Sequence, residues 1–235
     1  MPRKLRVNRG GLAYHVLNRG NAQMRIFESQ GDYYAFEKVL AQACDKTNMR
    51  LLTYCLMPNH WHLVLWPRCD GDLSNFMYWL TMTHTQRWHA NRHNIGGGHL
   101  YQGRFKSFPI QDDSHFLTVC RYVERNALQA KLVNKVQDWQ WCSLWQRMQG
   151  NSNNQLKLSA WPVAQPDDWL KLVNIRQSSD EADLIKQCII RDRPFGSPKW
   201  LIQMVKRFSL ESTIRPKGRP KKTENKAKRM SKKCS

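Results

Sequence analysis

Residues 51–66 read Leu51-Leu52-Thr53-Tyr54-Cys55-Leu56-Met57-Pro58-Asn59-His60-Trp61-His62-Leu63-Val64-Leu65-Trp66. Two apolar runs flank a short turn, a pattern that predicts two strands, 51–56 and 60–66, paired as an antiparallel hairpin. Side chains alternate between the two faces of a strand, so we expect His60 and His62 to share one face and Trp61 to occupy the other. Two neutral imidazoles on one rigid face supply half of a divalent-metal site. A pair of strand histidines is also a common polar feature at the edge of a core.

A second informative segment follows residue 112 and has apolar residues at helical spacing. The apolar positions are Phe116, Val119, Cys120, Val123 and Ala127. Tyr122 and Asn126 are four residues apart, so they project from the same helical face. A hydroxyl beside an amide oxygen suits a nucleophile next to a third metal ligand. In an isolated helix the same pair is an ordinary half-buried aromatic residue and a residue near the helix end.

The order of the expected elements points to the fold. The sequence predicts strands at 12–18, 51–56, 60–66 and 108–111, and helices at 32–46, 72–93 and from Ser114. The order β-α-β-β-α-β-α is close to a split β-α-β, ferredoxin-like sandwich, an α+β fold with an antiparallel sheet. We expect a main domain over residues 1–150, a helical extension over 151–214 and a disordered basic tail over 215–235.

The charge of the chain favours nucleic acid as its partner. The chain has 38 lysines and arginines and 18 acidic residues, which gives a net charge of +20. Residues 215–233 carry ten of these cations and one glutamate, a net +9, so +11 remains on the preceding residues. A body that is basic without its tail fits DNA or RNA first and an anionic membrane surface second. Ten tryptophans, seven tyrosines and eight phenylalanines offer rings on which bases can stack.

Cysteine usage and hydropathy indicate the compartment. The seven cysteines are an odd number without a Cys-x-x-Cys pair, which argues against a disulfide framework or a zinc ribbon and for a reducing environment. The chain opens without a signal-peptide pattern, and no apolar run approaches the length of a membrane span. We therefore expect a cytoplasmic protein that does not associate with membranes.

Four segments together resemble a known family. They are Tyr14-His15-Val16-Leu17-Asn18-Arg19-Gly20, Met57-Pro58-Asn59-His60-Trp61-His62-Leu63-Val64, Gly103-Arg104-Phe105-Lys106-Ser107 and Tyr122-Val123-Glu124-Arg125-Asn126. This set resembles the single-tyrosine HUH transposases, and among them the REP-associated tyrosine transposases, bacterial relatives of insertion-sequence transposases. The resemblance covers residues 10–147 and extends more weakly to 196–200 and 216–220. One departure is Ala127, where the family often has proline; alanine should let the helix continue through Asn126.

The resemblance implies a metal-dependent endonuclease and strand transferase that acts on single-stranded DNA beside a REP-type hairpin. In that scheme Tyr122 forms a covalent 5′-phosphotyrosine, while His60, His62 and Asn126 hold Mg²⁺ or Mn²⁺; ligand softness alone also admits Zn²⁺. Two other functions stay open: a DNA-binding protein of the same fold without turnover, and a metallo-hydrolase that uses bound water and does not need Tyr122. The active unit is a monomer or a homodimer.

Arg19, Arg104 and Lys106 are predicted DNA contacts, because phosphate contacts come from loops and strand ends such as those expected here. Each of the three has the alternative interpretation of a solvated surface charge. Lys217 and Arg219 are predicted contacts of the tail, where Lys217-Gly218-Arg219-Pro220 resembles the Arg-Gly-Arg-Pro core that enters AT-rich minor grooves; a non-specific basic tail is the alternative. We interpret His89 and His93 as an exposed helix end and not as a metal pair.

Overall fold

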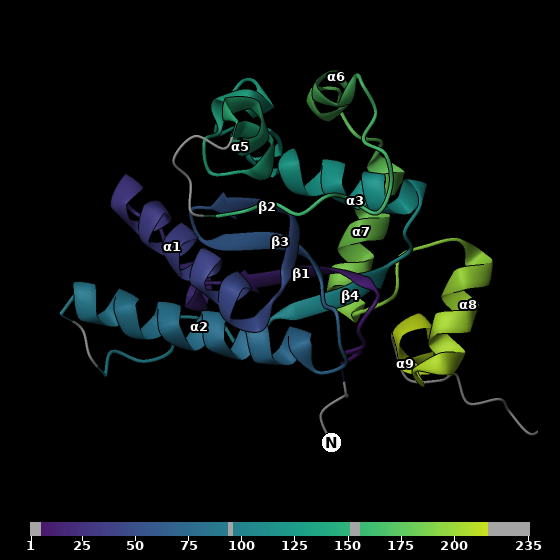
Figure 1. Cartoon of the computed structure of the whole chain (residues 1–235), viewed down its shortest axis with the longest axis horizontal. Helices are drawn as coiled ribbons and strands as arrows, with labels where there is room; N and C mark the ends of the chain where they lie inside the picture. The colour runs from purple at the N-terminus through teal and green to yellow at the C-terminus, as the bar shows by residue number, and fades with distance from the viewer. Residues whose placement is uncertain (1–5, 94–95, 151–155, 216–235) are drawn as a thin grey trace, which may run out of the picture.

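The computed structural model describes residues 6–93, 96–150 and 156–215 (Figure 1). Its centre is one antiparallel sheet with the strand order β2-β3-β1-β4. The strands are β1 (Ala13–Arg19), β2 (Arg50–Met57), β3 (His60–Trp66) and β4 (Lys106–Ile110). With helices between β1 and β2 and between β3 and β4, this arrangement confirms the predicted α+β, ferredoxin-like class.

Strand pairing sets which side chains share a face. Strands β2 and β3 form the predicted hairpin, in which Met57 pairs with His60 across the turn. On the other side of β3, Leu17 of β1 lies opposite His62 and Arg19 lies opposite His60. Directly opposed residues point to the same face, so alternate residues of β1 line the face that carries both histidines.

Helices cover both faces of the sheet (Figure 1). On one face lie α1 (Gln30–Thr47) and α2 (Asp72–Asn91), and on the other lie α3 (Ser114–Glu124), α5 (Ser143–Gln149) and α6 (Trp169–Asn174). Short 3₁₀ turns occur at Asn21–Gln23 and Val136–Asp138. Trp61 is fully buried in the core beneath α1 and α2, where its Nε1 donates to Tyr101 Oη at 3.1 Å.

After residue 156, α6 and α7 (Ser179–Arg191) pack on the histidine-bearing side of the sheet, whereas α8 (Pro198–Arg207) and α9 (Glu211–Ile214) lie beside the sheet (Figure 1). Trp169 and Ile185 share one core cluster with Phe116 of α3, and Phe195 exchanges backbone hydrogen bonds of 2.9 Å with the end of β4. The expected extension is therefore joined to the α3 layer by a common core. The tail beyond residue 215 lies outside the described residues.

The tyrosine-bearing helix is interrupted, contrary to the expectation from Ala127. Helix α3 ends at Glu124, and a separate single turn, α4 (Asn126–Gln129), follows. The side-chain amide of Asn126 donates to the carbonyl oxygen of Tyr122 at 2.9 Å. Asparagine side chains compete in this way with backbone hydrogen bonds, so the side chain itself offers a reason for the break.

A buried carboxylate holds the end of α3. Glu124 is fully buried and accepts hydrogen bonds from Ser143 Oγ at 2.6 Å and from Trp169 Nε1 at 2.8 Å. Arg147 forms an ion pair with the same carboxylate. Because these partners belong to α5 and α6, the network fixes the position of α3 two residues after Tyr122. Within the described ranges, none of the helices combines the length and apolarity that a membrane crossing needs.

Candidate active site

The structure brings His60, His62 and Tyr122 together between the sheet and α3. The ring centroids of His60 and His62 lie 5.0 Å apart, and those of His62 and Tyr122 lie 5.8 Å apart. Trp61 is packed in the opposite layer, so the prediction that the histidines share one face is confirmed. Strand β3 and helix α3 are distant in sequence, and the sheet and its α3 layer bring their side chains into one cluster.

A third histidine, which the sequence analysis left without a role, completes this cluster. His15 of β1 is fully buried, and its Nε2 lies 2.8 Å from Nδ1 of His62. Its ring stacks on Phe108 at 4.9 Å and lies 6.4 Å from the ring of Tyr122. Strand alternation puts His15 on the same face as Arg19, and this was the sequence signal that could have identified it.

Hydrogen bonds leave one nitrogen of each β3 histidine available as a ligand. Nδ1 of His60 lies 2.6 Å from the amide oxygen of Asn59, which can only accept, so this nitrogen carries the proton and Nε2 carries a lone pair. In His62, Nδ1 is engaged by His15, and a proton there again leaves a lone pair on Nε2. Metal-binding histidines have this pattern, with the second ring nitrogen held by a partner. The two rings therefore fit a divalent cation as a pair.

Burial keeps the three imidazoles neutral. It lowers the pKa of His15 to about 3, and with the charge of Arg19 it lowers the pKa of His60 to about 4. Burial, reinforced by His60, His15 and Arg19, holds the pKa of His62 well below its ordinary value. Burial raises the pKa of Tyr122, and Arg19 opposes this shift. At neutral pH the histidines thus offer lone pairs, whereas the tyrosine keeps its proton and requires an activated electrophile.

Asn126, the predicted third ligand, is placed differently from the histidines. Its side chain lines a cavity together with Tyr122, and no hydrogen bond among the described residues joins it to His60 or His62. No group of three or more His, Cys, Asp or Glu side chains in this part of the chain is arranged to hold a metal ion. A cation between the two imidazoles would therefore need oxygen ligands from an amide, water or the substrate.

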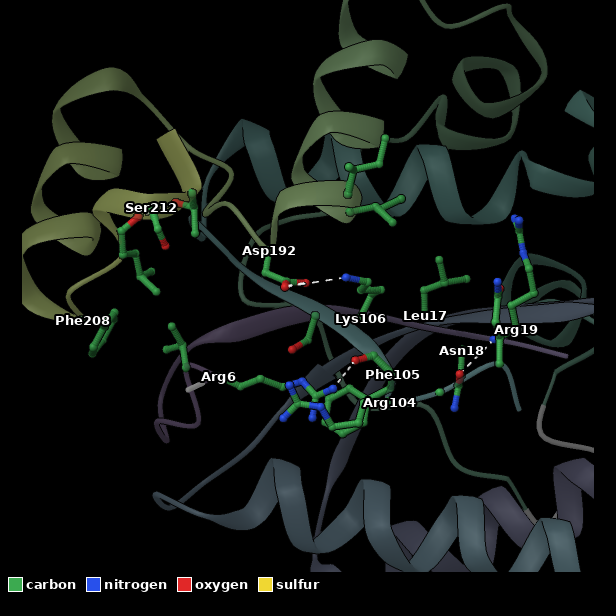
Figure 2. A pocket seen from close by; sticks show the side chains of 18 of the residues that line it. Arg6, Leu17, Asn18, Arg19, Arg104, Phe105, Lys106, Asp192, Phe208 and Ser212 are labelled. Carbon is green, nitrogen blue, oxygen red and sulfur yellow. Dashed lines mark hydrogen bonds and ion pairs between the residues drawn. The ribbon is translucent and has the colours of Figure 1, made fainter. Parts of the chain in front are cut away.

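A groove of about 790 Å³ opens where β1 ends and β4 begins (Figure 2). Arg19, Arg104 and Lys106 all line it, so the structure brings these three predicted DNA contacts to one surface. Its opposite wall comes from α7, from residues 208–210 between α8 and α9, and from residues 212 and 213 of α9. Arg19 lies opposite His60 in the pairing of β1 with β3, so the groove is next to the histidine–tyrosine cluster, and its charge acts on His60, His62 and Tyr122.

The groove is cationic. Sequence analysis missed Arg6, whose guanidinium lies 3.9 Å from the ring centroid of Phe105 and donates to its carbonyl oxygen at 2.6 Å (Figure 2). Burial, together with the charge of Arg104, lowers the pKa of Arg6 to about 10. Asp192 is the one carboxylate among the described lining residues, and it lies 3.8 Å from Lys106 Nζ. Four basic side chains against one acid favour an anionic ligand.

Other predicted residues lie apart from this site or outside the described chain. His93 is exposed just after α2, as expected, whereas His89 is half-buried against Trp88. Lys217 and Arg219 lie outside the described residues.

Comparison with known proteins identifies the family. The family model described as "Transposase IS200 like" matches residues 8–126, slightly more than half of the chain. The chain belongs to the IS200-like transposase family. The matched span contains β1 to α3, and with them His15, His60, His62 and Tyr122. No curated protein matches the sequence.

One solved structure shares the fold of this IS200-like transposase. A REP-associated tyrosine transposase bound to a REP hairpin matches with a TM-score of 0.51 and 16% sequence identity, covering 68% of this chain and 92% of that chain. A candidate transposase from Deinococcus radiodurans R1 has a TM-score of 0.39 and 16% identity, with 52% and 96% covered. At this identity the first likeness shows the fold.

Proposed function

We propose that this IS200-like transposase is a metal-dependent nuclease and strand transferase for single-stranded DNA beside a hairpin, with Tyr122 as its nucleophile. One observation carries the proposal: Tyr122 lies 5.8 Å, between ring centroids, from His62 of the strand-borne histidine pair. The neighbouring cationic groove supports DNA as the substrate. The fold shared with a REP-associated transposase supports a REP-type hairpin as the target.

The reaction is a transesterification at phosphorus. Tyr122 Oη loses its proton to water and bonds to phosphorus, the P–O3′ bond breaks, and the leaving oxygen takes up a proton. The products are a free 3′-OH and a 5′-phosphotyrosine. Because the phosphodiester energy is retained, attack by a 3′-OH reverses the step and joins strands without a nucleotide cofactor. The positive charge of Arg19 favours the phenolate form of Tyr122 and would stabilise the negative charge of the scissile phosphate.

The Nε2 atoms of His60 and His62 are the proposed protein ligands of Mg²⁺ or Mn²⁺, with Asn126 Oδ1 as a third ligand. When bound, such an ion polarises the scissile phosphate and stabilises charge on the leaving oxygen. Asn126 uses its amide nitrogen to bind the Tyr122 carbonyl, so its oxygen is the atom left for this role.

The groove is the proposed site for the DNA backbone near the cut. Arg6, Arg19, Arg104 and Lys106 would contact phosphates there, while Lys217 and Arg219 of the tail would add non-specific affinity. In this proposal, residues 1–150 cut and join the DNA strand, the extension over residues 151–214 lines one side of the groove, and residues 215–235 form a DNA-binding arm. We further propose that the protein acts in the cytoplasm as a monomer or homodimer.

A second candidate is a DNA-binding protein of the same fold without turnover. One observation favours it: among the described residues, no group of three or more His, Cys, Asp or Glu side chains is arranged to hold a metal ion. Such a protein would use the cationic groove and leave the histidine–tyrosine cluster idle.

An assay on hairpin DNA with randomised single-stranded flanks tests the proposal. With Mg²⁺ or Mn²⁺ the full chain should cleave a subset of the library and form a protein–DNA adduct that survives denaturation, and a chelator should abolish both. Binding without cleavage would establish the second candidate. Cleavage without an adduct would identify a water-activating hydrolase.

A further inference from the structure

A second cavity, of about 320 Å³, opens beside Tyr122 between the α3–α4 region and α7. Tyr122 and Asn126 line one side of it, and Ser179 and Ala182 of α7 line another. It shares no lining residue with the groove of Figure 2, so the two are separate hollows. Its volume has room for about one nucleotide.

This cavity is also cationic. Arg125, Arg176 and Lys186 line it, and Asp183 is the one carboxylate among the described lining residues. Asp183 pairs with Lys186 at 2.9 Å, which leaves the two guanidinium groups without an acidic partner in the described structure. Arg125 and Arg176 line the same cavity, and Arg121 contacts the backbone of Ile175 next to Arg176, so the three arginines are neighbours. Burial lowers the pKa of Arg125, and the charges of Arg121 and Arg176 lower it further.

The backbone holds part of this guanidinium cluster in place. Arg121 Nη2 donates to the carbonyl oxygen of Ile175 at 2.9 Å, and Arg125 Nη1 donates to those of Val173 and Asn174 at 3.4 and 3.3 Å. Arg125 Nε is buried and has no hydrogen-bond partner among the described residues. Fixed guanidinium groups that repel one another and retain unused donors are suited to bind a phosphate.

The geometry of the proposed reaction tells which part of the DNA this cavity would take. In an in-line displacement the leaving 3′ oxygen departs on the side of phosphorus opposite to the attacking Tyr122 oxygen. The other strand remains joined to Tyr122 Oη through its 5′ phosphate, so this covalent bond keeps its first nucleotides next to the tyrosine after the cut. A cavity lined by Tyr122 itself is therefore beside the retained strand.

We propose that the cavity between α3–α4 and α7 binds the backbone of the first nucleotides 3′ of the cut, the segment that remains joined to Tyr122. This inference rests on the proposed function, because it takes Tyr122 to be the nucleophile. It gives α7 of the extension a direct role: holding the cleaved strand until it is rejoined. The groove of Figure 2 is left for the strand that ends in the 3′-OH and for the hairpin.

Binding of a 5′-phosphorylated oligothymidylate tests the cavity without any cleavage. Arg176 is exposed and makes no hydrogen bond or ion pair in the described structure that would stabilise the fold, so Arg176→Gln should fold normally. We expect its affinity for the probe to fall about threefold to tenfold, and the log–log salt slope to fall by about 0.7 for the lost phosphate contact. Arg68→Gln, an exposed arginine outside both cavities, is the matched control. Equal losses in both variants, or no loss in Arg176→Gln, would overturn the proposal.

A crosslinking experiment tests the assignment to the retained strand. In the covalent adduct, 4-thiothymidine as the first nucleotide after the phosphotyrosine should crosslink to the α7 peptide that contains Ser179 and Ala182; crosslinks to groove residues instead would refute the assignment. The experiments also distinguish a failure of the cavity proposal from a failure of the proposal that Tyr122 is the nucleophile. An adduct with normal probe binding by Arg176→Gln refutes the cavity proposal alone. Loss of probe binding with no adduct refutes the nucleophile, and with it the link between the cavity and a cleaved strand.

Discussion

Nε2 of His15 lies 2.8 Å from Nδ1 of His62, so a buried histidine of β1 fixes the orientation of a ring on β3. The contact follows from the strand register, in which Leu17 lies opposite His62 and His15 is two residues away on the same face. Outer partners of this kind set the tautomer and direction of metal-ligating histidines. In the proposed mechanism, His15 therefore positions His62 without touching the substrate.

Replacing His15 by phenylalanine should weaken metal binding more than folding. Phenylalanine preserves the packing on Phe108 and removes a ring nitrogen, Nδ1, that is buried and unpaired in the described structure. We expect the affinity for Mn²⁺ to fall about 10- to 100-fold, as for other outer-shell losses, with thermal stability close to that of the wild type. Calorimetric titration with Mn²⁺ measures this. His15→Gln, which can restore a hydrogen-bonding group near Nε2, should recover part of the affinity; unchanged binding by His15→Phe would contradict the positioning role.

The His60–Trp61–His62 segment should separate chemistry from stability. His60→Ala and His62→Ala should each abolish metal-dependent cleavage while the variants stay folded. Trp61→Ala should cost about 3–5 kcal/mol in the free energy of unfolding, because it removes a fully buried indole and its bond to Tyr101. Urea unfolding and a cleavage assay on the three proteins decide this. Normal cleavage by either alanine variant of a histidine would count against the metal ligands.

Asn126→Ala should have a smaller effect on metal dependence than either histidine variant. Water can replace one neutral oxygen ligand, whereas the loss of an imidazole removes one of the two nitrogen ligands. The concentration of Mn²⁺ at half-maximal cleavage measures the effect. A loss as complete as that of His60→Ala would show that Asn126 is indispensable.

Local sequence pattern was sufficient to predict the strands and to place two residues of the candidate site, His60 and His62, on one face. Apolar runs on either side of a short turn predicted β2 and β3, and period-2 alternation put His60 and His62 on one face. What local pattern could not give was the contact between strands: His15 becomes relevant only through the register of β1 against β3. The break after Glu124 was missed because helix propensity at Ala127 was weighed without the hydrogen bond from Asn126 to Tyr122.

The cationic hollows were predicted only in part. Arg19, Arg104 and Lys106 were found because each stands at a strand end or turn, and the fold unites them in one groove. Arg125 and Arg176 come from segments about 50 residues apart, and they meet only because α6 and α7 pack against α3. Such clusters are products of tertiary packing, for which sequence periodicity holds no signal.

Deleting residues 215–235 should weaken DNA binding without moving the cut. Residues 215–233 carry a net +9, and each phosphate contact contributes about 0.7 on single strands, or about 0.9 on duplex, to the log–log salt slope. With three such contacts the slope should fall by about two units. Affinity measured across a salt series, together with mapping of the cleavage position, checks both parts. A truncated chain with an unchanged slope would show that the tail is not a DNA arm, and a displaced cut would show that it takes part in recognition.

Acid should destabilise the fold through His84, which lies in the layer opposite the site. Its ring is fully buried, with Nδ1 2.6 Å from Tyr101 Oη, and burial lowers its pKa from 6.5 to about 3; the charges of Arg92 and Asp32 act in opposite directions. The unfolded chain protonates His84 below pH 6.5, whereas the folded chain protonates it only near pH 3. Protonation of the unfolded chain therefore lowers the free energy of unfolding as the pH falls below 6.5, and above pH 6.5 this loss is absent. This ring should contribute up to about 1.4 kcal/mol per pH unit to the decline. Urea unfolding between pH 7.5 and 5 should show a shallower decline for His84→Gln; parallel declines would contradict this assignment.

The most direct test of the account is to locate the covalent bond on the protein. After incubation with cleavable hairpin DNA and Mn²⁺, nuclease and protease digestion followed by mass spectrometry should find a nucleotide on the Tyr122 peptide of the wild-type chain. Tyr122→Phe should bind the same DNA with nearly unchanged affinity and yield neither cleaved product nor adduct, because it lacks only the attacking oxygen. Cleavage by Tyr122→Phe at the wild-type rate, or an adduct on another residue, would contradict the central claim.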